Sequence, residues 1–250
     1  MCEEIKTETD LPRGVDMRKL AVGLISFAAA LVAGLFIDAS ARAQQLNPKE
    51  TAVLFVDFQN EFASETGNLY PILKDELKRK NVLENAVSLM KTARERGMLI
   101  VHTTAGYSPG YAELDAGNPG LFHKIVRARK AFVAGSPGVE LWDQLRPGPK
   151  DTDIVLKGRT AMSGFRGTDL NYVLRSKGIK NLAIAGFVTN ICVEQTGRDA
   201  YDLGFHNYFL ADVMAAKNAE DQAFTEKNNF TYIGKVTSWR EFVDMIAVTQ

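Results

Sequence analysis

Short apolar runs alternate with amphipathic stretches from residue 48 onward, and this alternation limits the folds that the chain can adopt. The apolar runs have the composition of buried strands and lie at 51–56, 98–103, 153–157, 181–186, 206–211 and 231–236. Between them, apolar residues recur at helical spacing over 81–97, 168–177, 190–203 and 219–229, and again in a terminal stretch at 238–246. The alternation predicts a three-layer α-β-α fold, with a six-stranded, mostly parallel sheet covered on both faces.

One segment departs from this alternation, the Gly- and Pro-rich stretch at 104–150. A connection of that length in a compact domain is usually a functional lid or a disordered segment. Its aromatic residues argue against disorder, and they are Tyr107, Tyr111, Phe122, Phe132 and Trp142. We therefore expect a lid or an oligomer contact within a single domain that spans 44–250.

The first 43 residues have the composition of an export signal. A short basic stretch at 18–19 precedes an apolar run at 20–37, and residues 41–43 read Ala-Arg-Ala. This order predicts a secretory signal that is cut after Ala43, so that the mature chain is periplasmic or secreted and has no membrane span. The run is also near the minimum length of a membrane span, so an uncleaved anchor at 20–37 stays open. Met17 is a second candidate start.

Charge and cysteine content narrow the classes of partner. Thirty Lys and Arg residues balance thirty Asp and Glu residues, so the formal net charge at pH 7 is zero. Because there is no basic stripe, nothing indicates binding to nucleic acid. Removal of residues 1–43 would also remove Cys2, leaving Cys192 as the only cysteine of an exported protein. Such a thiol is either buried and inert or retained for its chemistry.

Three chemically active side chains stand where predicted strands end. Asp57 follows the strand at 51–56, Lys157 ends the strand at 153–157, and Cys192 lies beyond the strand at 181–186. In a parallel sheet the carboxyl ends of the strands share one edge, where ligands bind. A cation at Lys157 would lower the thiol pKa, and Asp57 would accept the thiol proton and later activate water. The first turn of a helix would also favour a thiolate at Cys192 and hold an oxyanion on backbone N–H groups.

Each of these residues also fits an ordinary structural role. A single cysteine is often a small buried hydrophobe, and an aspartate at a strand end commonly caps a turn. Lys157 alone fits a solvated surface cation. His102 is an alternative base, because histidine is the commonest catalytic base. Residue spacing alone leaves these alternatives open.

Three blocks of sequence resemble the signature segments of the isochorismatase-like cysteine hydrolases. They are "FVDFQNEF" at 55–62, "LKGRTAMSGFRGTDL" at 156–170 and "GFVTNICVEQTGRDAYDLGF" at 186–205. The resemblance implies a catalytic triad of Asp57, Lys157 and Cys192. It further implies a cis peptide at Phe187–Val188 and an oxyanion hole formed by the backbone amides of Val188 and Cys192.

Within that family, the last block is most similar to the ureidoacrylate, biuret and N-carbamoyl amidohydrolases. The resemblance therefore implies hydrolysis of a C–N bond in a small amide, ureide or N-carbamoyl compound through an acyl-enzyme on Cys192. Family members are often dimers or tetramers, so a homo-oligomer is expected. Candidate substrate contacts, chosen by position, are Gln59, Phe62, Tyr107, Arg159 and Phe165.

We expect neither a metal nor another cofactor. Nicotinamidase-like members bind a metal through an Asp-x-His motif and a further histidine, whereas the segment after Asp57 contains no histidine. The three histidines, His102, His123 and His206, have no metal-type spacing.

Two other functions stay open. The chain fits an isochorismatase-type hydrolase of another small substrate, although isochorismatases commonly lack the cysteine. It also fits a non-catalytic oligomeric binding protein or thiol sensor that uses oxidation of Cys192. A sensor usually keeps a second, resolving cysteine, and the mature chain would have none.

Overall fold

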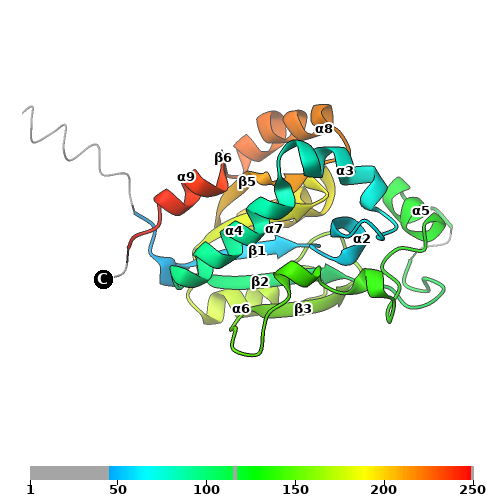
Figure 1. The fold of residues 1–250 in the computed structure, drawn as a ribbon, viewed down its shortest axis with the longest axis horizontal. Coiled ribbons are helices and arrows are strands. Elements are labelled where there is room, and N and C mark those ends of the chain that lie inside the picture. Colours follow the sequence, from blue (N-terminus) through cyan, green and yellow to red (C-terminus); the bar gives the residue numbers. More distant parts are fainter. Residues whose placement is uncertain (1–44, 115–116, 249–250) are drawn as a thin grey trace, which may run out of the picture. The chain divides into compact units, whose positions relative to one another are not determined.

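The computed structural model describes residues 45–114 and 117–248, so the export signal expected at 1–43 lies outside the described residues. Residues 45–250 form one compact unit, which is drawn in Figure 1. Within the described part, no helix has both the length and the apolar character that crossing a membrane requires.

A six-stranded sheet in the order β3-β2-β1-β4-β5-β6 forms the middle layer. Its strands are β1 Thr51–Val56, β2 Leu99–Ala105, β3 Ile154–Arg159, β4 Asn181–Phe187, β5 His206–Ala215 and β6 Lys235–Thr237. Each pair of neighbours is parallel, which confirms the predicted fold class. The chain runs outward from β1 to β3, then returns to the other side of β1 at β4, so that β1 and β4 form the centre of the sheet.

Alternate residues of the central strand β1 face opposite layers, because successive side chains of a strand point to opposite faces. Val53 and Phe55 pack in the core on one face and Leu54 and Val56 in the core on the other. All six residues of β1 are buried. This explains why the strand reads as a continuous apolar run instead of an alternating one.

Helices cover both faces of the sheet (Figure 1). Residues of α3 Tyr70–Arg79, α4 Val82–Glu95 and α9 Trp239–Asp244 pack in the first core. The second core contains residues of α6 Leu170–Ser176 and α7 Glu194–Asp202. The remaining helices are α2 Asn60–Ala63, α5 Leu121–Ala128 and α8 Ala219–Phe224. The sequence analysis placed no helix at α2, α3 or α5.

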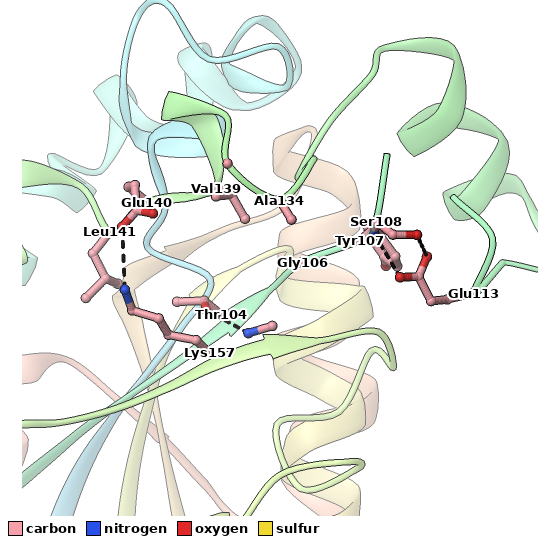
Figure 2. Close-up of a pocket in the computed structure, with 12 residues that line it drawn as sticks. Thr104, Gly106, Tyr107, Ser108, Glu113, Ala134, Val139, Glu140, Leu141 and Lys157 are labelled. Atoms are coloured by element: carbon pink, nitrogen blue, oxygen red, sulfur yellow. Dashed lines mark hydrogen bonds and ion pairs between the residues drawn. The ribbon is translucent and has the colours of Figure 1, made fainter. Parts of the chain in front are cut away.

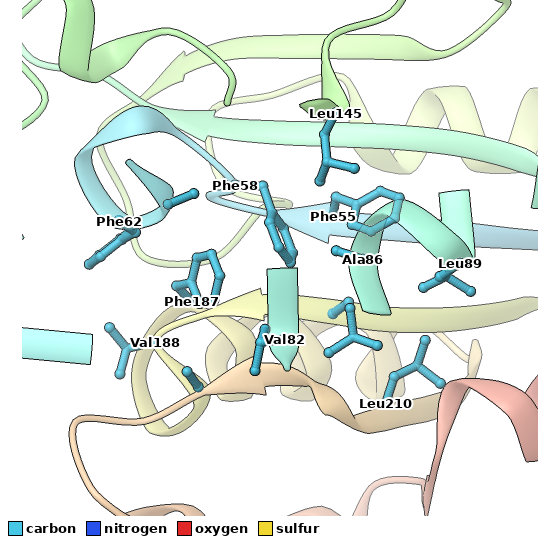
Figure 3. Close-up of a cluster of buried hydrophobic side chains, with 14 of the residues drawn as sticks. Phe55, Phe58, Phe62, Val82, Ala86, Leu89, Leu145, Phe187, Val188 and Leu210 are labelled. Carbon is cyan, nitrogen blue, oxygen red and sulfur yellow. The ribbon is translucent and has the colours of Figure 1, made fainter. Parts of the chain in front are cut away.

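The segment 104–150 is packed against the domain. Phe132 and Leu145 are fully buried in the first core, and Figure 3 shows Leu145 close to Phe55 and Phe58. The side chain of Gln59 binds the segment at two points. Its Nε2 donates to the carbonyls of Ala105 at 2.8 Å and Val139 at 2.7 Å. The aromatic residues thus belong to an ordered part of the fold. A lid or oligomer role for the segment stays a prediction.

Candidate active site

Asp57 begins the loop that leaves the carboxyl end of β1. Its backbone has a φ of 59°, a region that residues other than glycine rarely adopt, although aspartate tolerates it better than most. Its N–H donates to the carbonyl of Thr103 at the end of β2, over 2.9 Å. The carboxylate, which is 1% exposed, is thereby held at the edge of the sheet where the sequence predicted it.

Cys192 follows β4, the strand next to β1. It lies in a π-helical turn at Thr189–Val193 that joins β4 to α7. The approach to the turn requires glycine at position 186, where φ is 142° and a Cβ would lie 2.1 Å from the carbonyl oxygen of Val56. The next peptide, Phe187–Val188, is cis, as the family resemblance implied. Thr196 fixes the turn from the following helix, because its hydroxyl donates to the carbonyl of Cys192 over 2.6 Å.

The Cys192 thiol is buried against Asp57. Burial raises the pKa of the thiol strongly, and the charge of Asp57 and a hydrogen bond to its carboxylate raise the pKa further. Arg159 and the backbone amide of Val188 act in the opposite direction but do not outweigh burial. The sequence argument expected a lowered pKa, so this part of it is wrong. The resting group is a neutral thiol that has a carboxylate beside it.

Lys157 does not join Asp57 and Cys192. Its side chain is 69% exposed, and its Nζ lies 3.6 Å from a carboxylate oxygen of Glu140. Figure 2 shows this pair at the wall of a surface pocket. The expectation that Lys157 shares the buried site is not met, and the local backbone gives the reason.

A bulge in β3 turns Lys157 outward and Arg159 inward. The pairing with β2 shifts register after Thr103–Leu156, so that Arg159 is the residue opposite Ala105. Gly158 sits in the bulge with a φ of 77°, which glycine adopts without steric cost. A regular strand would place residues 157 and 159 on the same face. Because of the extra residue in the bulge, Lys157 and Arg159 lie on different faces of the strand. Arg159, and not Lys157, therefore reaches the buried site.

Arg159 is the cation that faces Asp57. Its Nη2 donates to Asp57 Oδ2 over 2.7 Å and to the carbonyl of Met162 over 2.9 Å, and its Nη1 donates to the other carboxylate oxygen. Burial on its own would lower the pKa of Arg159, but the Asp57 carboxylate outweighs it and the pKa is raised. Arginine is well suited to such a buried pair, because its planar fork matches a carboxylate. The sequence analysis had named Arg159 only as a candidate substrate contact.

The other candidate contacts have different surroundings. Gln59 is fully buried, and its amide is used by backbone groups. Tyr107 is 2% exposed, and the charges of Cys192 and Asp57 contribute to its raised pKa after burial, so it faces the same buried site. Phe62 is buried beside Phe187 and Val188 (Figure 3). Phe165 packs beside Phe205 on the other face of the sheet.

His102 has a structural environment. It is fully buried, stacks on Phe55 with ring centroids 5.2 Å apart, and places Nε2 3.3 Å from Asp153. Arg94 pairs with the same carboxylate at 2.8 Å. The geometry thus offers no support for His102 as the alternative base.

Pockets open near the buried site in the described part of the chain, and two of them matter for the site. The first has a volume of about 410 Å³ and is lined by residues that include Tyr107, Glu140 and Lys157 (Figure 2). The second has a volume of about 220 Å³ and is lined by residues that include Phe62, Val188 and Ile191. In the described part of the chain, no group of three His, Cys, Asp or Glu side chains is placed to hold a metal.

Comparison with known proteins shows which family the chain belongs to. The sequence model of the protein family described as the isochorismatase domain matches residues 51–241. The ureidoacrylate amidohydrolase RutB of Acinetobacter baylyi is 32% identical over 222 residues, which cover 84% of this chain and 89% of the relative.

Solved structures of hydrolases have a similar fold and a related sequence. A cysteine hydrolase from Pseudomonas syringae pv. phaseolicola matches with a TM-score of 0.67 and 25% identity, covering 80% of this chain and 94% of the other. The N-carbamoylsarcosine amidase from Thermoplasma acidophilum matches with a TM-score of 0.59 and 25% identity, covering 76% of this chain and 96% of the other. The chain described here belongs to the isochorismatase family of hydrolases.

Proposed function

We propose that the chain hydrolyses a C–N bond of a small amide, ureide or N-carbamoyl compound through a covalent intermediate on Cys192. The observation that carries this proposal is the burial of the Cys192 thiol beside Asp57, whose charge raises the thiol pKa and whose carboxylate is in turn fixed by Arg159. A nucleophile, a base and a group that orients the base form the usual arrangement of covalent catalysis. The amidase activities named for the similar proteins support the same bond type.

The raised thiol pKa decides how the first step proceeds. Because the resting thiol is neutral, Asp57 accepts its proton as Sγ attacks the carbonyl carbon. Sγ–C bond formation places negative charge on the carbonyl oxygen, which the amides of Val188 and Cys192 are proposed to bind. The C–N bond then breaks, and Asp57 returns the proton to the leaving nitrogen, which yields an amine or ammonia and a thioester.

Water completes the cycle. The Asp57 carboxylate removes a proton from a water molecule, whose oxygen attacks the thioester carbonyl. The C–S bond breaks, the acid leaves, and the thiol recovers its proton. We assign Arg159 the position of the triad cation, in place of Lys157. It holds the carboxylate in orientation through two hydrogen bonds and balances its charge in a buried site.

Intact-protein mass spectrometry during incubation with small amides and ureides tests this proposal. We expect a transient mass increase that is absent from Cys192→Ala, together with release of ammonia or amine. Arg198→Ala is a suitable control, because Arg198 lies exposed on α7 and pairs there with Glu194. Reversible oxidation of Cys192, without an adduct or product from any compound, would instead support a thiol sensor. The same spectrum of exported protein tests our further proposal that the mature chain begins at Gln44.

A further inference from the structure

The smaller pocket reaches the wall of the proposed oxyanion hole. Val188, Asn190 and Ile191 contribute to its lining, and they come from the same turn as Cys192. The backbone amide of Val188 acts to lower the pKa of the thiol, which places it on the side of Sγ. A molecule whose carbonyl lies over Cys192 therefore has this pocket beside it, and its non-reacting part is the group that would fill the pocket.

The walls of the pocket are mostly apolar, with Asn190 as the uncharged polar residue of the lining. Side chains of α2, α3 and α5 close it opposite the turn, among them Phe62, Ile72, Phe122 and Ile125. Two charged residues belong to the lining, Lys217 and Asp221, and they form an ion pair with each other over 3.4 Å. Lys217 is 63% exposed, so this pair lies at the mouth of the pocket. The lining thus offers no unpaired cation to a bound anion.

We propose that the substrate carries an uncharged, apolar group on the side that enters this pocket, and that the enzyme discriminates against substrates with a carboxylate there. The inference rests on the proposed hydrolysis at Cys192. An unpaired carboxylate in an apolar site loses its hydration without compensation, whereas an alkyl group gains from leaving water. A volume of about 220 Å³ lies below the usual range for drug-sized ligands, so the group is small, such as a branched alkyl chain.

Two pairs of compounds of matched shape test the inference. In the pair 4-methylpentanamide and succinamate, an isopropyl group and a carboxylate occupy the same place. The ureides isobutylurea and N-carbamoylglycine differ in the same way. We expect kcat/KM for ammonia release to be at least about 100-fold higher for the neutral member of each pair. Protection of Cys192 against alkylation by iodoacetamide measures binding independently of turnover, and the neutral members should protect at lower concentration.

A charge placed at the mouth should shift this preference. Leu121 contributes to the pocket lining and is 74% exposed, so Leu121→Arg adds a cation without disturbing the core. We expect this variant to reduce the discrimination at least about 10-fold, since the added guanidinium can form a charge-assisted hydrogen bond with the carboxylate of the substrate. Tyr172→Arg is the matched control, because Tyr172 is also 74% exposed but belongs to α6, away from the pocket. It should leave the preference unchanged.

The outcomes separate the two proposals. Equal or better hydrolysis of succinamate and N-carbamoylglycine would overturn the apolar specificity and leave hydrolysis at Cys192 in place. Preferential protection of Cys192 by the neutral compounds without turnover would support the pocket assignment and contradict the proposed reaction. If none of the four compounds is hydrolysed and none protects Cys192, both proposals are contradicted.

Discussion

Arg159 and Asp57, 102 residues apart in the sequence, form an ion pair with two hydrogen bonds in which neither side chain is more than 1% exposed. The thiol of Cys192 shares Asp57 with this pair. The site therefore contains a cation, a carboxylate and a neutral thiol, and the pKa of the thiol depends on the charges of the other two groups. Predictions for each residue follow from that dependence.

Replacing Arg159 should affect both folding and chemistry. Arg159→Met leaves the buried carboxylate unpaired, which costs roughly 3–5 kcal/mol of unfolding free energy. Arg159→Lys keeps a charge but cannot reproduce the planar fork. We expect kcat/KM to fall in the order wild type, Arg159→Lys, Arg159→Met, measured on any compound that forms the Cys192 adduct. Denaturant unfolding reports the stability of each variant.

Lys157→Met is the control for these variants. Lys157 and Glu140 are 69% and 49% exposed, and exposed pairs of this kind contribute about 0–1 kcal/mol. We expect unchanged kcat/KM and nearly unchanged stability. A loss of activity in Lys157→Met comparable with that in Arg159→Met would contradict the assignment of the cation to Arg159.

Asp57→Asn should make the thiol easier to ionise while it stops turnover. The Asp57 carboxylate raises the pKa of Cys192, so its neutralisation lowers that pKa and leaves the positive charge of Arg159 unbalanced beside the thiol. At pH 8, we expect faster alkylation of Cys192 by iodoacetamide than in the wild type, followed by peptide mass spectrometry. Loss of the base should reduce kcat by roughly 10²–10⁴. Slower alkylation in Asp57→Asn would show that the carboxylate instead activates the resting thiol.

The bulge at Gly158 should be required for activity beyond its effect on stability. A side chain at a φ of 77° is strained by about 1–2 kcal/mol, and relief of that strain would restore a regular strand and rotate Arg159 out of the site. Gly178→Ala is the matched control, because Gly178 has a φ of 70° and, as at Gly158, an added Cβ meets nothing within 4 Å. We expect similar losses of stability from both substitutions and a loss of kcat/KM only from Gly158→Ala.

The strand pattern was sufficient to predict the sheet, its parallel pairing and the positions of Asp57 and Cys192 beyond two central strands, although the last strand is β6 Lys235–Thr237 and not 231–236. Asp57 and Cys192 follow strands that are apolar after their first residue, so their positions relative to the sheet edge can be counted from the sequence. Every residue of β1 and β4 is buried, which is why each strand can be recognised in the sequence as a short apolar run.

Arg159 could not be placed by the same count, because β3 lies at an edge of the sheet and is only partly buried. Its apolar pattern ends before Lys157, while the strand itself continues through a bulge to Arg159. The available signal was the glycine between the two cations, since a glycine within a strand pattern often marks a bulge. The sequence also could not predict that the Cys192 thiol is neutral, because its pKa depends on burial by residues that are distant in the sequence.

Alkaline stability gives a separate check on the buried Cys192 and the partly buried Lys80, because their pKa shifts have opposite signs. Burial raises the pKa of Cys192, so above about pH 8.5 the unfolded chain loses this proton first and unfolding free energy falls as pH rises. Burial lowers the pKa of Lys80 from 10.5 to about 8. Between these two values the unfolded chain binds more protons at Lys80, and unfolding free energy rises with pH.

Urea unfolding between pH 7 and pH 10 separates the two contributions, each with a maximum slope of about 1.4 kcal/mol per pH unit. Cys192→Ser removes the falling contribution, so its stability relative to the wild type should increase above pH 8.5. Lys80→Met removes the rising contribution, so its relative stability should decrease over the same range. The amine of Lys80 also donates to the carbonyl of Ala211 over 2.6 Å, and loss of this bond adds a constant offset but little slope. Parallel curves for all three proteins would mean that neither group is as buried as the structure places it.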